Sequence, residues 1–378
     1  MRFLHIGDLH LGKVVNNFSM LGDQRHILNQ IVGHVKASKP DAVILAGDIF
    51  DRSVPPAAAV SLYNDFLKEL LITEKTAVFA VAGNHDGADL IHFGHELFEA
   101  ANYFVAGHFT PKLRKITLKG VNVYLLPFAD PVVVREAYKD KEIRSLEDAA
   151  KAVMAQNPLD PDARNILVTH GYLSGGVDIL EETDSEKRLV IGGKETVSAS
   201  IYRAFDYVAL GHLHRAQPVL SCNVRYSGSI LKYSFSEEKD KKSATLVEMD
   251  DTGGISVSYL PLKPLREVRT LRGELADLLS QPSSEDYLRV ILTDRGEVME
   301  PMAKLREIYP YVMTLSLERD LSERFQSQGI DLDAVSQKTT LELFSDFYFR
   351  QRERPLPEAG CKVIENILKT VEGQNETA

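Results

Sequence analysis

Residues 1–10 read MRFLHIGDLH, in which a short apolar run is followed at once by glycine, aspartate and histidine. Residues 1–8 are predicted as a short buried strand, and the same apolar pattern recurs at residues 41–46 and 76–82. Apolar residues at helical spacing lie between these strands, at 27–35 and, after Pro55-Pro56, at 62–70. The order β-α-β-α-β predicts an α/β domain.

This α/β pattern continues to residue 262, with further strands expected at 121–126, 165–169, 207–210 and 245–249 and polar loops between them. Pro261-Leu262-Lys263-Pro264 indicates a domain boundary, because two prolines in four residues oppose both helix and strand. Strands at 287–293 and 311–317, around a helix at about 297–308, predict a small α+β module over 263–336. Two amphipathic helices, separated by the proline-rich residues 354–357, are expected within 337–378.

The composition is that of a globular protein. Of its 378 residues, 44% are hydrophobic and 26% charged, which argues against a disordered or disulfide-rich chain. The apolar runs are too short to span a bilayer, and the start of the chain lacks the pattern of a signal peptide, so a cytoplasmic protein is expected. The net charge of −10 counts against a protein that coats nucleic acid by charge alone, unless bound metal ions cancel acidic groups.

Five short polar motifs follow predicted strands. They are Gly7-Asp8-Leu9-His10, Gly47-Asp48-Ile49-Phe50-Asp51, Gly83-Asn84-His85-Asp86, Thr169-His170-Gly171 and Gly211-His212-Leu213-His214. Functional groups of open α/β sheets gather at the carboxyl ends of the strands, where glycine permits a tight turn. We therefore expect these side chains to form one site.

The side chains in these motifs predict the chemistry of the site. Carboxylate, amide and imidazole ligands without cysteine suit Mn²⁺, Fe²⁺ or Zn²⁺. Seven candidate ligands are more than one tetrahedral ion can use: Asp8, His10, Asp48, Asn84, His170, His212 and His214. Two ions are therefore expected, and one carboxylate shared between them would hold them about 3.5–4 Å apart, as in enzymes that displace groups at phosphorus.

In this order the five motifs resemble the calcineurin-like metallophosphoesterases, whose pattern is D-x-H, G-D-x-x-D, G-N-H-[DE], a single H and G-H-x-H. The stretches LHIGDLHLG at 4–12, YSGS at 226–229 and YSF at 233–235 narrow the resemblance to the SbcD family of DNA-repair nucleases. It covers essentially the whole chain. It implies a four-layer αββα sandwich over 1–262, a small DNA-capping α+β module and C-terminal helices.

The resemblance also implies a role for each site residue. It assigns Asp8, His10 and His214 to one ion and Asn84, His170 and His212 to the other, with Asp48 as the bridge. His85 matches the family's histidine that is not a ligand and that protonates the departing 3′ oxygen as a general acid. Asp51 is expected to orient this imidazole or to stabilise its charge, although archaeal relatives often carry histidine at this position.

The activity and partners that the resemblance implies are those of a DNA end-processing enzyme. They are double-strand 3′-5′ exonuclease and single-strand or hairpin endonuclease activity with two Mn²⁺ ions. ATP hydrolysis is expected in an SbcC-type ATPase partner, since the chain has no G-x-x-x-x-G-K-[ST] loop. The C-terminal helices are expected to bind that partner, in a heterotetramer of two nuclease and two ATPase chains. We also expect a homodimer of this chain, a location at the nucleoid and no contact with a membrane.

Two other functions compete with this interpretation. A phosphoprotein phosphatase or a cyclic-nucleotide phosphodiesterase would share the metal chemistry, but the long extension after Leu260 argues against both. A scaffold that had lost its metals would keep the fold, but the intact set of ligand residues argues against it. Any single motif, such as Asp8 or Asp48 alone, could instead cap a helix.

Several charged and apolar residues have open roles. The run 237–242 reads mainly as a solvated hairpin loop. Lys13, Arg25, Arg52 and Lys232 could meet DNA phosphates or be ordinary surface cations. Apolar residues of the helix at 24–35 could form a dimer interface or belong to the core.

Overall fold

The computed structural model describes residues 1–175, 180–186, 196–296 and 298–318, together with 344, 345, 348, 356, 357 and 360. The chain divides into two compact units, Met1–Leu315 and Ser316–Ala378, and the elements considered below lie in the first, except that the last strand extends to Leu317. The helices expected within 337–378 lie almost entirely outside the described residues. Residues 319–336, at the end of the predicted module 263–336, lie outside them as well.

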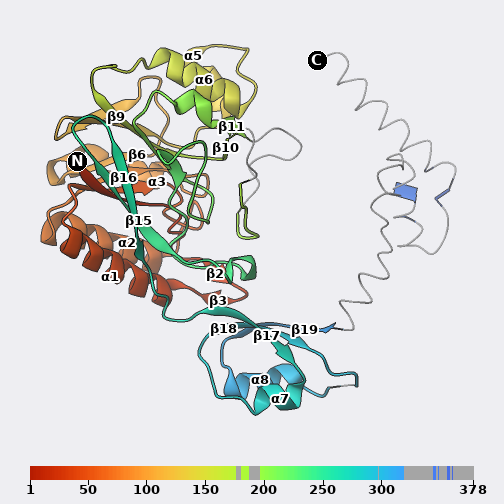
Figure 1. Cartoon of the computed structure of the whole chain (residues 1–378). Helices are drawn as coiled ribbons and strands as arrows, with labels where there is room; N and C mark the ends of the chain where they lie inside the picture. The colour runs from red at the N-terminus through yellow and green to blue at the C-terminus, as the bar shows by residue number, and fades with distance from the viewer. Residues whose placement is uncertain are drawn as a thin grey trace. The chain divides into compact units, whose positions relative to one another are not determined.

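Two six-stranded sheets form the middle of the first unit (Figure 1). The first has the order β16-β15-β1-β4-β5-β6, and its strands β1, β4, β5 and β6 are parallel to one another. Its strands are β1 (Arg2–Ile6), β4 (Ala42–Ala46), β5 (Ala77–Val81), β6 (Tyr103–Ala106), β15 (Ser243–Met249) and β16 (Ile255–Pro261). The second, in the order β13-β14-β12-β9-β8-β7, comprises β7 (Arg114–Leu118), β8 (Val121–Leu126), β9 (Arg164–His170), β12 (Tyr207–Gly211), β13 (Gln217–Pro218) and β14 (Val224–Tyr226).

Helices cover the outer faces of the two sheets, which gives four layers in the order αββα (Figure 1). The first sheet packs against α1 (Leu21–Ser38) and α2 (Ala57–Lys68), which continues into the π-helix η1 (Glu69–Thr73). The second packs against α5 (Pro131–Tyr138) and α6 (Leu146–Gln156). The predicted four-layer αββα sandwich is therefore confirmed.

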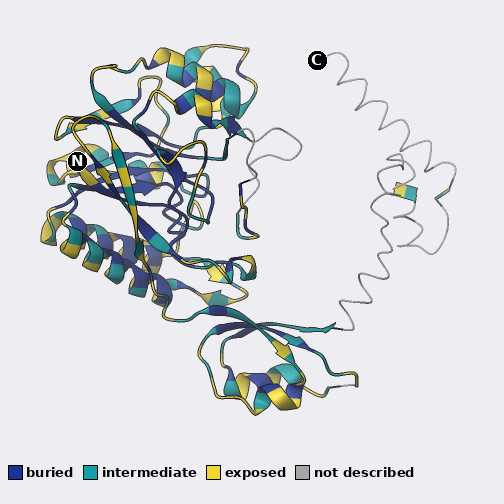
Figure 2. Ribbon diagram, viewed as in Figure 1, coloured by how far each residue is buried: buried dark blue, intermediate teal, exposed yellow. Residues whose placement is uncertain are grey.

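The inner strands β1, β4, β5, β8, β9 and β12 are buried on both faces, and Figure 2 draws buried residues in dark blue. Successive strand residues point to opposite faces, so Leu4 packs toward the helices while Phe3 packs between the sheets. Phe3 and Tyr207 meet there from the two sheets with ring centroids 5.2 Å apart. Burial on both sides explains why the strand sequences are continuous apolar runs.

The apolar face of α1 belongs to this core. Ile27, Leu28, Ile31 and Val35 are at most 2% exposed and lie in the cluster that joins the first sheet to its helices. The sequence left open whether the apolar residues of this helix form a dimer interface or belong to the core. The structure supports the core.

The connection between residues 126 and 164 differs from the predicted polar loop, because it contains α5 and α6. Both helices begin with capping residues. The Asp130 side chain accepts a hydrogen bond from the Val132 amide and is followed by Pro131, while Ser145 and Asp148 form a capping box. Strands β6, β7, β14 and β16 were likewise absent from the sequence prediction.

The small α+β module has a three-stranded sheet in the order β17-β18-β19. Its elements are β17 (Val268–Gly273), α7 (Leu275–Leu279), β18 (Tyr287–Leu292), α8 (Pro301–Ile308) and β19 (Val312–Leu317). The helix predicted at about 297–308 corresponds to α8. It begins later than predicted and has Pro301 in its first turn.

The remaining elements are short: β2 (Val14–Val15), β3 (Phe18–Ser19), α3 (Ala88–His92), α4 (His95–Phe98), η2 (Glu99–Ala101), β10 (Leu173–Ser174), β11 (Val197–Ser198), η3 (Ala199–Tyr202) and η4 (Phe235–Glu237). Among the described residues, no helix combines the length and the apolar character needed to cross a membrane.

Candidate metal centre

The five predicted motifs all lie at the carboxyl ends of strands. In the first sheet, β1, β4 and β5 lead into Asp8, Asp48 and Asn84 respectively. In the second sheet, β9 ends at His170 and β12 ends one residue before His212. Because the Asp8 carboxylate accepts a hydrogen bond from the His212 amide at 2.9 Å, the strand ends of the two sheets meet at one place.

The backbone is strained at this place. Asp8, His10, Asp48 and His212 have φ angles of 53°, 45°, 49° and 120°. Residues other than glycine rarely adopt such angles, and they do so mainly where the surrounding structure imposes them for a function. Gly83 is required for packing, since a β-carbon there would overlap the Asp48 carboxylate.

One group of candidate ligands consists of Asp8, His10 and His214. Each offers one ligand atom, and the three atoms lie within 4.8 Å of one another. The Nε2 atoms of His10 and His214 are 3.1 Å apart. All three side chains are buried, so they could surround a metal ion from within the protein.

A second group lies beside the first. Asn84 Oδ1 is 2.9 Å from His170 Nε2 and 3.3 Å from His212 Nδ1. Asp48 lies between the groups, because its Oδ2 atom is 3.4 Å from His170 Nε2 and 3.6 Å from His10 Nε2. The structure therefore brings together all seven predicted ligands.

The electrostatics of the cluster suit a cation. Burial lowers the pKa of His10 to about 4 and that of His212 to about 3, so both rings are neutral near pH 7 and have a lone pair to offer. Burial alone would also lower the pKa of His170, but the charge of Asp48 raises it to about 9. Without metal, a proton on His170 thus compensates a buried carboxylate. The donor set and this compensated charge fit divalent ions.

Asp86, the last residue of its motif, supports the centre from outside. Its carboxylate accepts hydrogen bonds from the amides of Gly83 at 2.9 Å, Phe50 at 2.8 Å and Ile49 at 3.1 Å. It thereby ties the loop that carries Asp48 to the loop that carries Asn84.

His85 and Asp51 lie next to the ligands. His85 Nδ1 is 2.8 Å from the carbonyl oxygen of Asp51, and its Nε2 atom is 3.9 Å from Asp48 Oδ2. The Asp51 carboxylate instead accepts a hydrogen bond from Lys13 Nζ at 2.7 Å and lies 3.6 Å from His10 Nδ1. Asp51 therefore contacts His85 Nδ1 through its backbone carbonyl oxygen, while its carboxylate lies within 4.8 Å of a ring nitrogen of His85.

The segment 237–242 is only partly the solvated loop that was predicted, since Lys239 and Lys241 are exposed but Glu237 and Lys242 are buried. Glu237 is 0% and Lys242 9% exposed, and Lys242 Nζ donates a hydrogen bond to Glu237 Oε2 at 2.6 Å. Burial alone would raise the pKa of Glu237, but the charge of Lys242 keeps it well below its usual value. The Glu237 carboxylate lies 3.8 Å from His214 Nδ1. No spacing signal in the sequence indicates this contact.

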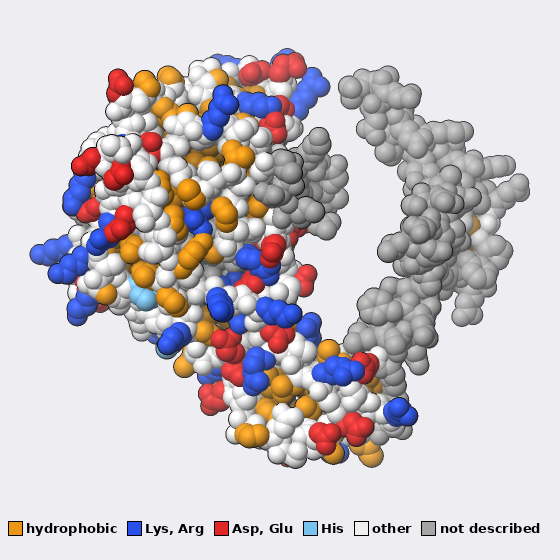
Figure 3. Space-filling view, in the orientation of Figure 1, with side chains coloured by type: hydrophobic (Ala, Val, Ile, Leu, Met, Phe, Trp, Pro, Cys, Tyr) orange, Lys and Arg blue, Asp and Glu red, His pale blue; other side chains and the backbone are white. Residues whose placement is uncertain are grey.

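Three of the predicted cationic side chains have acidic partners. Lys13 binds Asp51, Arg25 Nη1 lies 3.3 Å from Asp65, and Lys232 Nζ lies 2.7 Å from Glu267. On the face drawn in Figure 3, basic and acidic side chains are intermixed over the surface.

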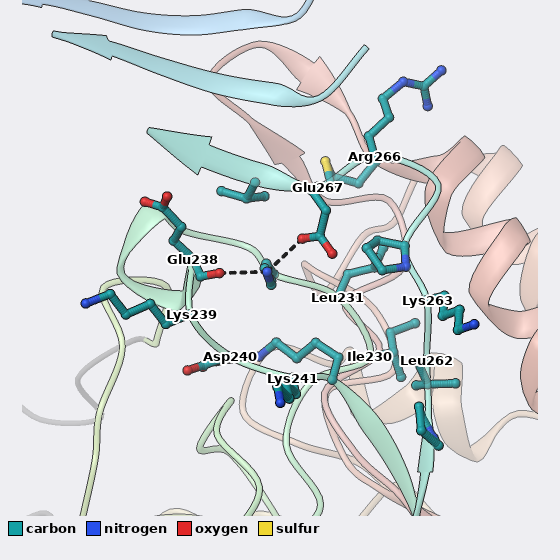
Figure 4. A pocket seen from close by; sticks show the side chains of 16 residues that line it. Ile230, Leu231, Glu238, Lys239, Asp240, Lys241, Leu262, Lys263, Arg266 and Glu267 are labelled. Carbon is teal, nitrogen blue, oxygen red and sulfur yellow. Dashed lines mark hydrogen bonds and ion pairs between the residues drawn. The ribbon is translucent and has the colours of Figure 1, made fainter. Parts of the chain in front are cut away.

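A cavity of about 540 Å³ lies outside the centre, between residues 238–242 and the chain that leads into β17 (Figure 4). In it, Lys232 Nζ donates hydrogen bonds to Glu267 Oε2 and to the Glu238 carbonyl oxygen, both at 2.7 Å. Basic and apolar side chains share its walls, among them Lys263, Arg266, Leu231 and Leu262.

Comparisons with known proteins agree with this geometry. The family model described as calcineurin-like phosphoesterase matches residues 1–216, and the model described as type 5 capsule protein repressor C-terminal domain matches residues 262–352. The SbcD subunit of the nuclease SbcCD of Staphylococcus epidermidis, a curated protein, is 32% identical over 378 residues, which are 98% of this chain and 99% of that protein.

Solved structures of lower similarity also match. A dimetal phosphatase from Danio rerio is 10% identical with a TM-score of 0.40, over 70% of this chain and 96% of its own. A protein of Thermus thermophilus is 14% identical with a TM-score of 0.38, over 68% of this chain and 98% of its own.

Proposed function

Since the chain belongs to the calcineurin-like phosphoesterases and, within them, to the SbcD family of nuclease subunits, we propose that it is a metal-dependent nuclease acting on DNA ends and hairpins. The reaction is hydrolysis of a phosphodiester bond, as double-strand 3′-5′ exonuclease and as single-strand or hairpin endonuclease. The observation that supports this proposal best is the convergence of two donor groups on the single carboxylate of Asp48.

In this proposal Asp8, His10 and His214 hold one divalent ion, while Asn84, His170 and His212 hold the other, and Asp48 contacts both. We propose Mn²⁺ as the ion. Two such ions would supply an activated water and would neutralise charge on the phosphoryl oxygens. The chain itself orients the ligands: the amides of His212 and His85 donate to the carboxylates of Asp8 and Asp48 at 2.9 and 2.8 Å.

His85 serves as the general acid in this mechanism. Its Nδ1 atom is held by the Asp51 carbonyl oxygen at 2.8 Å, so the ring has a fixed orientation with Nε2 toward the centre. From there it can deliver a proton to the 3′ oxygen that departs from phosphorus. The Asp51 carboxylate accepts a hydrogen bond from Lys13 Nζ at 2.7 Å and lies 3.6 Å from His10 Nδ1. It therefore contributes negative charge beside the His10 ring.

The proposed partners are DNA, an SbcC-type ATPase subunit and a second copy of this chain, in a heterotetramer of two nuclease and two ATPase chains. Exposed apolar side chains around α3 and α4 support a protein contact there, since Phe93 is 76%, Leu97 79% and Phe98 43% exposed. The proposed location is the cytoplasm, at the nucleoid. The proposed domains are 1–262 for catalysis, 263–336 for capping DNA and 337–378 for binding the ATPase.

Cleavage of a linear duplex and of a DNA hairpin with Mn²⁺, with and without the ATPase partner and ATP, tests the proposal. Chelator-sensitive cutting by the wild type, absent in His85→Ala, is expected. Intact DNA together with hydrolysis of a generic phosphodiester dye would instead identify another phosphoesterase. A chain that binds no metal and cleaves neither substrate would be a scaffold.

A further inference from the structure

Both ring nitrogens of His214 have close neighbours. Nε2 lies 3.1 Å from His10 Nε2, on the side where Asp8 and His10 gather. Nδ1, across the ring, lies 2.6 Å from the hydroxyl oxygen of Ser185. The five motifs do not include Ser185, which lies in a different segment of the chain.

The contact continues from Ser185 to Glu237. Ser185 Oγ donates a hydrogen bond to Glu237 Oε1 at 2.7 Å. An ionised carboxylate can only accept, so the single hydroxyl proton of Ser185 points to Glu237. The Ser185 oxygen must therefore accept from Nδ1–H of His214, which leaves Nε2 of the neutral ring without a proton and free to bind a metal.

Buried partners fix the Glu237 end of this chain. Glu237 Oε2 accepts from Lys242 Nζ at 2.6 Å, and Oε1 also accepts from the Tyr233 amide at 3.1 Å. Lys242 in turn donates to the His214 carbonyl oxygen at 2.8 Å. The side chain and the backbone of His214 are thus bound to the same buried ion pair.

We propose that Ser185 and Glu237 are positioning residues that select the metal-binding tautomer of His214 and thereby set the affinity of the ion shared by Asp8, His10 and His214. This inference rests on the proposed function, because it assumes the metal site. The outer hydrogen-bond partners of a histidine ligand commonly contribute about 10–100-fold to metal affinity. Only one of the two ions should depend on this contact, since His170 and His212 have other partners.

Ser234 offers a matched control within the same network. Its hydroxyl donates to the same oxygen, Glu237 Oε1, at 3.0 Å, but it is not among the hydrogen-bond partners of His214 in the described part of the chain. Ser234→Ala therefore removes one donor from the carboxylate without removing the acceptor of the His214 proton. Ser185→Thr keeps the hydroxyl group and therefore tests whether a hydroxyl at this position is enough to maintain the metal affinity.

The experiment is titration of the metal-free, full-length chain with Mn²⁺ by calorimetry, with the wild type and the three serine variants. Ser185→Ala should bind one of two ions about 10–100-fold more weakly and the other unchanged, while Ser185→Thr and Ser234→Ala should bind like the wild type. Wild-type affinity for both ions in Ser185→Ala, or equal weakening in all three variants, would overturn the inference alone. A wild type that binds fewer than two ions would overturn the proposed function and the inference with it.

Discussion

Asp23 and Gln24 are neighbours on α1, yet their buried side chains bind two different parts of the molecule. Gln24 Nε2 donates to the His10 carbonyl oxygen at 2.7 Å, and its Oε1 accepts from the Gly12 amide at 3.0 Å. Asp23 Oδ2 accepts from the Tyr287 hydroxyl at 2.7 Å and from Arg266 at 3.1 Å. One turn of helix therefore holds both the loop that carries His10, a candidate ligand, and the small module.

Asp23→Asn should destabilise the protein, because the amide keeps the shape of the side chain but removes the charge opposite Arg266. Hydrogen bonds to charged groups contribute about 1.5–3 kcal/mol, so a loss of roughly this size in the free energy of unfolding is expected. Urea unfolding measures it. Asp65→Asn breaks the exposed pair with Arg25 and should cost less than about 1 kcal/mol. Equal losses in the two variants would contradict the anchoring role of Asp23.

His85→Ala should keep both metal ions and the affinity for DNA but should lose turnover. The reason is that a general acid acts in the transition state, where its removal costs about 10²–10⁴-fold in kcat. Mn²⁺ titration, a DNA-binding assay and single-turnover cleavage together measure the three quantities. His108→Ala is the control. It replaces an exposed histidine and should be fully active. If His85→Ala also lost an ion, His85 would be a ligand rather than the acid.

Asp48→Ala should lose both ions, since the carboxylate lies between the two groups of donors. In the wild type, Mn²⁺ at about a hundredfold excess over its dissociation constant should stabilise the fold by about 2.7 kcal/mol per site. Thermal unfolding with and without Mn²⁺ should show this gain, and the gain should vanish in Asp48→Ala. Asp89→Ala, which removes a fully exposed carboxylate, should retain the gain in stability with Mn²⁺. Two tightly bound ions in Asp48→Ala would refute the bridging role.

The sequence predicted the fold, and the clustering of the candidate ligands, well because both depend on local patterns. Asp8, Asp48 and Asn84 each follow a buried strand, and parallel strands bring their carboxyl ends to one edge of a sheet. The capping box at Ser145 and Asp148 was a local signal too, and with it α6 could have been predicted.

The contacts that support the ligands could not be predicted in this way. Ser185 is 29 residues from His214, and Gln24 meets Tyr233 across 209 residues. Such pairs have no fixed spacing, since they depend on how the finished layers pack. The run 237–242 reads as solvated because charged residues are seldom buried unless paired, and the pairing of Glu237 with Lys242 appears only in three dimensions.

His5 should make the stability of the metal-free protein depend on pH. The ring lies between the sheets, where Nε2 donates to the Leu210 carbonyl oxygen at 3.1 Å and Nδ1 is 3.0 Å from the Tyr207 hydroxyl. Burial, and then the charge of Arg225, lower the pKa of His5 from its usual 6.5 to about 3. Between these values the unfolded chain binds a proton that the folded chain does not, so stability rises with pH in this window.

The contribution of His5 is fully present above about pH 6.5 and is lost as the pH falls toward about 3. The candidate ligands His10 and His212, whose pKa values are also lowered, add to the wild-type slope, so the contribution of His5 must be measured as a difference. His5→Gln should reduce the slope of unfolding free energy against pH by up to about 1.4 kcal/mol per pH unit, measured by urea unfolding in chelator. His108→Gln, at an exposed position, should keep the wild-type slope. An unchanged slope in His5→Gln would mean that His5 takes up its proton equally well in the folded and unfolded states.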